Sequence, residues 1–350
     1  MLTDELIRRT GEWLKGTGPD SDVVLSTRLR LARNVQPFLF PSAAPVQEKA
    51  RIESHIRERL ERCKLPKDRW YAAVDRLPPL DRQFLVERHL ISRDHANGTG
   101  ARGILAGGKE SFGIMINEED HLRIQVMRSG FEMEDAWKEL NAIDDALSAE
   151  IPYAFDSQFG FLTACPTNMG TGLRISIMLH LPALVFVKQV DKVLNSLTRV
   201  NYTARGLFGE GSEATGDFYQ ISNQISLGKS EGEMMTEIGN IIPQIINFER
   251  SWRKKLLNDD RRKLEDRVWR AVGILKNARL IHSEETMNLL SILRLGENLK
   301  IIDSIPIHVL NELFIFTQPS HLQKIENVEL RPEERDALRA DYIRKRLNVV

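Results

Sequence analysis

Short apolar runs separated by polar turns fill the chain from about residue 23 to residue 228. In several of them apolar and polar side chains alternate, which is typical of a strand with one buried face. Two longer segments, 133–147 and 184–194, keep a helical spacing of apolar residues instead. The segments predicted as strands are 23–28, 84–91, 112–116, 122–127, 202–208 and 218–225. Strands joined by turns, with helices between the groups, predict an α+β domain, an antiparallel sheet flanked by helices.

The pattern becomes helical after Ser230, which has the spacing of a capping box with Glu233. Further helices are expected over 264–275, over 284–295 with Ser283 as the cap, and over 307–316. Pro332 suits the first turn of a last helix. We therefore expect an N-terminal segment (1–22), a catalytic domain (23–250) and an all-helical C-terminal domain (251–350) that offers a surface for dimerisation.

Composition excludes several classes of protein. The chain has 350 residues, 42% hydrophobic and 28% charged, with a net charge of zero, so nothing draws it as a whole to nucleic acid or membrane. Two cysteines make neither a disulfide framework nor a zinc site, and Cys63 ends a helical run as a core residue. The N-terminus lacks signal-peptide character and no apolar window is long enough to span a membrane. We expect a cytoplasmic protein.

A turn with three adjacent carboxylates separates the expected strands 112–116 and 122–127. Its sequence is Asn-Glu-Glu-Asp-His, residues 117–121. Adjacent carboxylates repel one another, which either a solvated turn or a cation-binding site tolerates. The turn alone does not decide between the two.

Arginines offer an anion site on the first strand. Alternation places Ser26, Arg28 and Arg30 on one strand face. Neighbouring guanidinium groups repel unless an anion lies between them, and polyphosphate fits their forked donors. Exposed strand faces also carry arginine without any ligand. Two glycine-rich segments have the spacing of nucleotide-binding loops but not their context. Residues 98–103 lack the flanking strand and helix, and residues 103–109 are followed by Glu110 in place of the required Ser or Thr.

Two more segments complete a recognisable order of motifs. Residues 165–174 read Cys-Pro-Thr-Asn-Met-Gly-Thr-Gly-Leu-Arg, and residues 205–206 read Arg-Gly ahead of a loop that carries Glu210. With the arginine strand and the acidic turn, this set resembles the phosphagen (guanidino) kinase family, and most closely its bacterial protein arginine kinase branch. The resemblance covers about residues 23–228 and extends to the helical tail.

The resemblance implies ATP and Mg²⁺ as cofactors, with no metal ligand directly from the protein. His89 would contact the base or the ribose. The ATP-binding residues that it implies are Ser26, Thr27, Arg28, Leu29, Arg30, His89, Arg123, Arg174, Ile175, Ser176, Ile177, Met178, Arg205, Gly206, Leu207, Phe208, Gly209 and Glu210.

The resemblance also implies the catalytic residues Glu119, Glu210 and Cys165. A guanidinium is protonated and delocalised, so its nitrogens are poor nucleophiles. Glu119 would accept a proton and Glu210 would orient the guanidinium, while the Cys165 thiolate would steady another nitrogen. Glu118 and Asp120 would act through metal-bound water or hold the turn.

The substrate implied is arginine in proteins, because the helical domain that precedes the arginine strand in small-molecule members has no room before Val23. In the tail, Arg335, Asp336, Arg339 and Ala340 match an allosteric phosphoarginine-binding motif. Implied partners are a heat-shock transcriptional repressor, a small zinc-containing activator, a Clp ATPase–protease and a second copy of the chain, in a stress-response role. A small-guanidine kinase and a phosphoarginine-binding adaptor are the alternatives.

Three positions depart from the wider family. Ser157 replaces a frequent glutamate, and Gln220 and Ser226 replace an aspartate and an arginine. Support for the cysteine loop, and the nucleotide and metal contacts made at the other two positions, are therefore in doubt.

Overall fold

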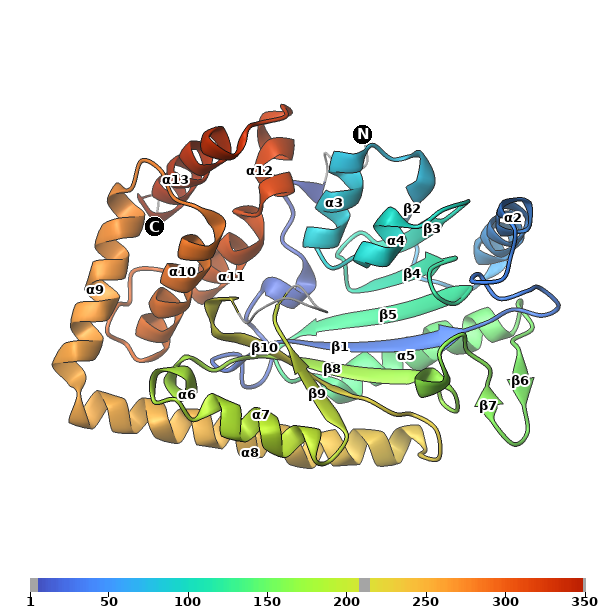
Figure 1. The fold of residues 1–350 in the computed structure, drawn as a ribbon, viewed down its shortest axis with the longest axis horizontal. Coiled ribbons are helices and arrows are strands. Elements are labelled where there is room, and N and C mark those ends of the chain that lie inside the picture. The colour runs from blue at the N-terminus through green and yellow to red at the C-terminus, as the bar shows by residue number, and fades with distance from the viewer. Residues whose placement is uncertain (1–5, 208–214, 349–350) are drawn as a thin grey trace.

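One antiparallel sheet forms the centre of the molecule (Figure 1). The computed structural model describes residues 6–207 and 215–348. Within that part of the chain, eight strands pair in the order β2-β3-β4-β5-β1-β8-β10-β9. They are β1 (Val24–Arg33), β2 (Arg69–Ala73), β3 (Gly103–Gly107), β4 (Phe112–Ile116), β5 (Leu122–Ser129), β8 (Leu173–His180), β9 (Tyr202–Arg205) and β10 (Phe218–Asn223). A separate hairpin joins β6 (Phe155–Asp156) to β7 (Gly160–Phe161). The expected α+β fold is confirmed.

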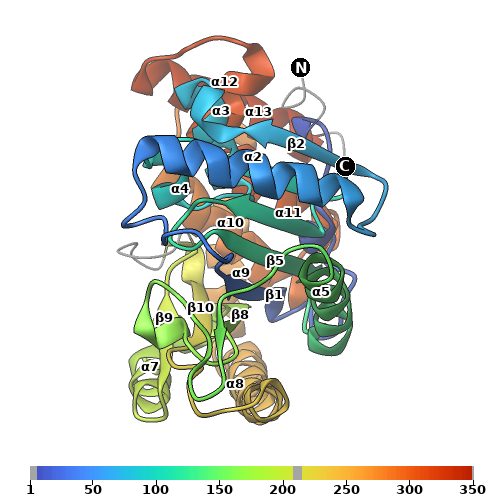
Figure 2. The ribbon, with the colours of Figure 1, turned by 90° about the vertical axis from the view of Figure 1, so that its right-hand side faces the viewer.

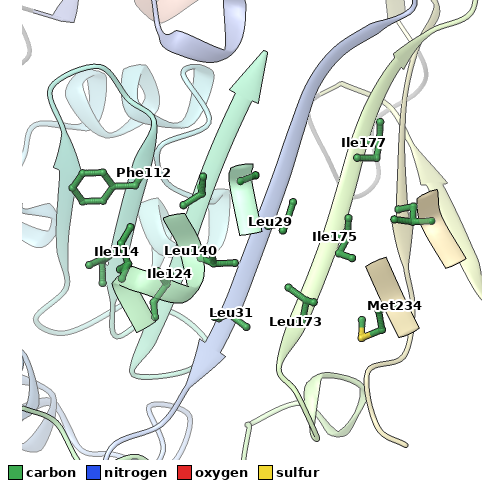
Figure 3. Packing of buried hydrophobic residues seen from close by; sticks show 14 of the residues in the cluster. Leu29, Leu31, Phe112, Ile114, Ile124, Leu140, Leu173, Ile175, Ile177 and Met234 are labelled. Carbon is green, nitrogen blue, oxygen red and sulfur yellow. The ribbon is translucent and has the colours of Figure 1, made fainter. Parts of the chain in front are cut away.

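The two faces of the sheet differ in chemistry. Leu29 and Leu31 of β1 lie between Val126 and Ile124 of β5 and Ile175 and Leu173 of β8. These side chains are buried and form the main core with α5 (Met133–Ser148) and α8 (Glu231–Asp259), as Figure 3 shows for Leu140 and Met234. Side chains at the alternate positions point to the other face, where the arginines gather.

Helices surround the sheet on several sides. In the side view of Figure 2, α7 (Val190–Thr198) and α8 lie below the sheet, while α3 (Pro79–Glu87) and α12 (Pro319–Glu326) lie above it. The other α-helices that precede α8 in the chain are α2 (Val46–Arg62), α4 (Arg93–Asn97) and α6 (Pro182–Phe186). None of the helices in the described ranges is long and apolar enough to cross a membrane.

The C-terminal helices share a second core with one end of the sheet. They are α9 (Arg261–Asn277), α10 (Ser283–Asn298), α11 (Ile307–Phe316) and α13 (Pro332–Asn348), whereas α12 packs mainly against α3. Phe218 of β10 meets Phe314 of α11 edge-on, with ring centroids 4.7 Å apart, and both are fully buried. The expected division at residue 250 falls inside α8.

Several local predictions are confirmed. The acidic turn joins β4 to β5, with Asn117 in the left-handed region at φ 58°. Ser230 and Glu233 form a complete capping box, α11 spans the expected residues and α13 begins at Pro332. Cys63 is buried directly after α2.

Other predictions are wrong. Residues 84–91 are not a strand: Pro78 and Pro79 start helix α3, which continues to Glu87. Because Phe84, Leu85 and Val86 form a short continuous apolar run, the segment did not distinguish a short buried helix from a strand. The segment 184–194 is broken between α6 and α7 at Lys188, which has φ 55°. His282 rather than Ser283 caps α10, and the central strand β8 was not predicted.

Candidate active site

The sheet pairing gathers arginines from three strands on one face. Arg30 lies opposite Arg174 of β8, Arg28 lies opposite Ser176, and Ala32 lies opposite Arg123 of β5. Residues directly opposite each other in an antiparallel pair point to the same side. Arg205 of β9 joins this face through Gln220, because these two residues are also paired. We call Arg28, Arg30, Arg123 and Arg174 the arginine face.

The electrostatics of the arginine face favour an anion. Burial, followed by the charges of Arg123 and Arg174, lowers the pKa of Arg28 to about 9. The pKa of Arg30 is also lowered, first by burial and then by the charge of Arg28. The Nε atom of Arg30 is buried without a hydrogen-bond partner among the described residues. A polyphosphate would supply both the acceptor and the negative charge that these groups need.

One carboxylate of the acidic turn already neutralises part of this face. Glu118 accepts hydrogen bonds from Arg123 Nη1 at 2.5 and 2.6 Å and from the Ser92 hydroxyl. Burial raises its pKa, but the charge and hydrogen bond of Arg123 outweigh this and bring it to about 2. Glu118 is therefore an ionised anchor that fixes Arg123 and the turn.

A small hollow adjoins the arginine face. It measures about 10 Å³, and it is lined by Trp13, Ser26, Arg28, His89, Met127, Ser176, Met178 and Gln220. His89 sits after α3 with φ 58°, and its ring meets Trp13 edge-on at 5.2 Å. Burial and the charges of Arg28 and Arg30 lower the pKa of His89 to about 3, so the ring is neutral. A space of this size holds about one water, so a nucleotide base would enter only after these side chains move.

The hollow contains residues that the sequence alone did not indicate. Met127 reaches it because β5 pairs with β1, and Trp13 comes from a 3₁₀ turn, Glu12–Leu14, outside the motifs. Gln220, which the sequence indicated only as a departure from the family pattern, reaches it because β10 pairs with β8. Arg28 Nη2 donates to Gln220 Oε1 at 2.6 Å. Gln220, where the sequence comparison with the wider family expects an aspartate, thus lies beside Arg28 and supplies an acceptor without a charge.

Not every residue expected to bind ATP points to this face. Leu29, Ile175 and Ile177 are core residues of the opposite face. Thr27 is buried, and its hydroxyl donates to Gly130 O at 2.7 Å. Leu207 is also buried, in the second core, and Gly206 precedes it. Phe208, Gly209 and Glu210 lie outside the described residues.

Glu119 and Cys165 are linked through their chain neighbours. Asp120 Oδ1 accepts a hydrogen bond from Ala164 N at 2.7 Å, so the residues beside Glu119 and Cys165 touch directly. Burial and the charge of Asp120 raise the pKa of Glu119, which suits a proton acceptor. The half-buried Cys165 has its Sγ atom 2.9 Å from Thr167 Oγ1.

A buried asparagine at the end of β1 connects three segments of the site. Asn34 Nδ2 donates to Asp120 Oδ1 at 2.6 Å and to Leu162 O at 3.1 Å. Its Oδ1 atom accepts from His121 N at 2.9 Å. The arginine strand, the acidic turn and the segment before the cysteine are therefore held by one side chain, which the motifs did not single out.

In the tail, the four expected phosphoarginine-binding residues lie on α13 but are unequally accessible. Arg339 is buried and donates to Thr317 O at 2.9 Å, Ile281 O at 2.8 Å and Asp336 Oδ1 at 2.5 Å. Ala340 is buried as well. Arg335 is partly exposed and donates to Leu330 O at 3.1 Å. In this arrangement Arg339 supports the helix packing, and Arg335 and Asp336 remain accessible.

Comparison with family models assigns both halves of the chain. Residues 51–252 match the ATP:guanido phosphotransferase C-terminal catalytic domain. Residues 261–350 match the protein-arginine kinase McsB C-terminal domain.

Similar proteins agree over nearly the whole length. A protein-arginine kinase of Symbiobacterium thermophilum is 45% identical, covering 99% of each chain, and one of Halothermothrix orenii is 42% identical, also covering 99% of each. That of Bacillus subtilis is 42% identical over 96% of this chain and 93% of its own.

Solved structures show the same fold. A duplicated taurocyamine kinase from Schistosoma mansoni, with transition state analog components bound, has a TM-score of 0.61 and 28% identity, covering 67% of this chain and 34% of that one. A lombricine kinase has a TM-score of 0.58 and 27% identity, covering 72% and 71%.

Proposed function

Because the chain belongs to the ATP:guanido phosphotransferase family, as its motifs indicated, we propose that it transfers the γ-phosphoryl group of ATP to arginine side chains in proteins. The arginine face carries this proposal, since it gathers four guanidinium groups whose mutual repulsion a bound polyphosphate would relieve. The similarity of residues 261–350 to a protein-arginine kinase domain supports protein arginine as the acceptor.

The arginine face would bind the phosphates of ATP. Phosphoryl transfer depends mainly on positioning and charge neutralisation, and arginines supply both without losing their charge. Mg²⁺, which the family implies, would neutralise phosphate charge when bound. Glu118 is already held by Arg123 and Ser92. The phosphates, rather than the Glu118 carboxylate, would therefore be the ligands of Mg²⁺.

Glu119 would accept the proton that leaves the guanidinium as the N–P bond forms. Its raised pKa makes it a better base than an ordinary glutamate at neutral pH. Glu210 would orient the guanidinium, and Cys165 would stabilise another of its nitrogens. Asn34 and Asp120 would set the distance between Glu119 and the segment around Cys165, residues 162–174, which we call the cysteine segment.

The regulatory role is proposed on the resemblance and on the tail. Arg335, Asp336, Arg339 and Ala340 would form an allosteric phosphoarginine site, for which Arg339 would have to exchange some of its present acceptors. Phosphorylation would mark cytoplasmic proteins for a Clp ATPase–protease and inactivate a heat-shock repressor. A small zinc-containing activator and a second copy of the chain would be further partners.

Mass spectrometry at neutral pH tests the reaction, since the N–P bond is acid-labile. The protein would be incubated with magnesium-ATP and an unfolded arginine-rich protein, with free arginine in parallel. We expect phosphoryl groups on protein arginines, absent with Glu119→Gln and retained with Glu134→Gln, a matched change on α5. Phosphorylation of free arginine alone would instead identify a small-guanidine kinase, and binding without transfer would identify an adaptor.

A further inference from the structure

Exposed apolar side chains gather around the candidate site. The described residues include twelve large hydrophobic side chains that are substantially exposed. Five of them, exposed by 42% to 56%, belong to segments bonded directly to the acidic turn or the cysteine segment. We call these five the apolar rim: Leu39, Phe155, Phe159, Ile225 and Leu227.

The β6–β7 hairpin brings two phenylalanines to one side of the cysteine segment. Phe161 N donates to Gly170 O at 2.9 Å, which attaches the hairpin to that segment. Phe155 packs edge-on against Phe161, with centroids 5.3 Å apart, and remains 56% exposed. Asp156 Oδ1 accepts from Phe159 N at 3.0 Å, which orders the turn that presents Phe159.

The segment after β10 brings Ile225 and Leu227 to the same loop. Ser226, between them, donates its hydroxyl to Met169 O at 2.8 Å and to Thr167 O at 3.3 Å. Gly170 approaches this segment so closely that an added Cβ would lie 3.0 Å from Leu227 Cα. The hairpin and this segment therefore both adjoin Gly170.

Leu39 is attached on the side of the acidic turn. His121 Nε2 donates to Leu39 O at 2.9 Å, while His121 Nδ1 accepts from Val35 N at 2.9 Å. The chain segment that presents Leu39 is thereby fixed next to Glu119 and Asp120.

Resting on the proposed function, we propose that the apolar rim binds apolar residues beside the substrate arginine in an extended polypeptide. Apolar side chains that stay in water around a functional site typically mark an interaction surface. The rim segments are hydrogen-bonded to the turn that carries Glu119 and to the loop that carries Cys165. A polypeptide whose arginine reaches these two residues would therefore lie close to the rim. Such apolar residues are mostly buried in folded proteins, so the rim would favour unfolded chains.

Paired peptides test this inference. Each has nine residues with a central arginine and equal charge, and leucine or serine stands two positions on either side of it. The ratio of kcat/KM for the leucine peptide to that for the serine peptide is measured for the unaltered protein, Phe155→Ser and Leu227→Ser. Leu280→Ser, a change at another exposed leucine, after α9, is the matched control. Peptide binding is also measured by fluorescence anisotropy without nucleotide.

We expect a ratio of roughly 10 in the unaltered protein and in Leu280→Ser, falling several-fold in both rim variants, as for burial of a leucine side chain. Equal ratios in all four proteins would overturn the inference. If rim variants instead changed only self-association in sedimentation, the rim would belong to a second copy of the chain. If no peptide were phosphorylated, the proposed function would fail. The difference in affinity between the leucine and serine peptides, measured by anisotropy, would then support the inference if the rim variants reduced it and overturn the inference if they did not.

Discussion

At the residue scale, the arginine face crowds positive charge on one side of the sheet. Replacing Arg30 by methionine should stabilise the nucleotide-free protein by about 1 kcal/mol or more, because removing a crowded, poorly hydrated charge relieves repulsion. The hydrogen bond that this change removes, from Arg30 Nη2 to Ser176 Oγ, is weak because its length is 3.4 Å. Urea unfolding without ligand measures the change in the free energy of unfolding.

The same variant should lose the stabilisation that polyphosphate provides. Tripolyphosphate should raise the midpoint of thermal unfolding of the unaltered protein, because it binds only the folded state. This increase should be small in Arg30→Met and unchanged in Arg93→Met, a surface arginine of α4. A destabilised Arg30→Met would contradict the repulsion within the arginine face, and an equal response to tripolyphosphate would show that Arg30 does not contribute to phosphate binding.

Part of the arginine face could be predicted from the sequence alone. Alternation along β1 placed Arg28 and Arg30 together, since the period of a strand is visible in one segment. Met127 was missed because its position depends on which strands are paired, a property of contacts between distant segments. Gln220 was singled out only as a departure from the family pattern, and its contact with Arg28 depends on the same pairing. Trp13 gave no signal, because its contact with His89 joins residues from the N-terminal segment and the end of α3.

At the element scale, Asn34 and Asp120 join the arginine strand, the acidic turn and the cysteine segment. Asn34→Ala should lower kcat by up to about 100-fold, the loss that a displacement of about 1 Å in a catalytic group can cause. ATP affinity should change little, because the arginine face is left intact. Steady-state kinetics together with direct nucleotide binding separate the two effects.

The matched control for Asn34 is Asn141→Ala, which removes an exposed amide on α5 that donates to Asp145. It should leave kcat unchanged. If Asn34→Ala weakened ATP binding as much as it lowered kcat, the asparagine would support the fold in general rather than the alignment of Glu119 with Cys165.

Elements themselves were predicted unevenly. The acidic hairpin and α11 were found because turn residues or helical periodicity bound them clearly. The run 84–91 was misassigned, since consecutive apolar residues fit either a strand or a buried helix. Strand β8 was not predicted, although its buried residues Leu173, Ile175 and Ile177 alternate with residues of the opposite face as in an ordinary strand.

At the scale of the whole molecule, Glu87 connects the catalytic half to the C-terminal helices. Its carboxylate accepts hydrogen bonds from Ser320 N and His321 N, both at 2.9 Å, at the start of α12. Burial raises its pKa from 4.5 to about 7, although these hydrogen bonds oppose the shift. The folded protein therefore binds a proton here more tightly than the unfolded chain does.

Stability should consequently fall as pH rises through this range. The contribution of Glu87 is complete below about pH 4.5 and is lost by about pH 7, a change of roughly 3 kcal/mol. Glu87→Gln should remove this component from the pH dependence of unfolding, and the exposed Glu333→Gln should not. An unaltered slope between pH 5 and 7 in Glu87→Gln would refute the assignment.

The candidate site as a whole should move a phosphoryl group from ATP to a guanidino nitrogen. Phosphorus-31 NMR of the protein with magnesium-ATP and an arginine-containing peptide observes this bond directly. We predict that a phosphoramidate signal grows as the γ-phosphate signal of ATP declines, and that Glu119→Gln prevents both changes. Release of inorganic phosphate alone, or phosphate esters on hydroxyl groups, would contradict this function.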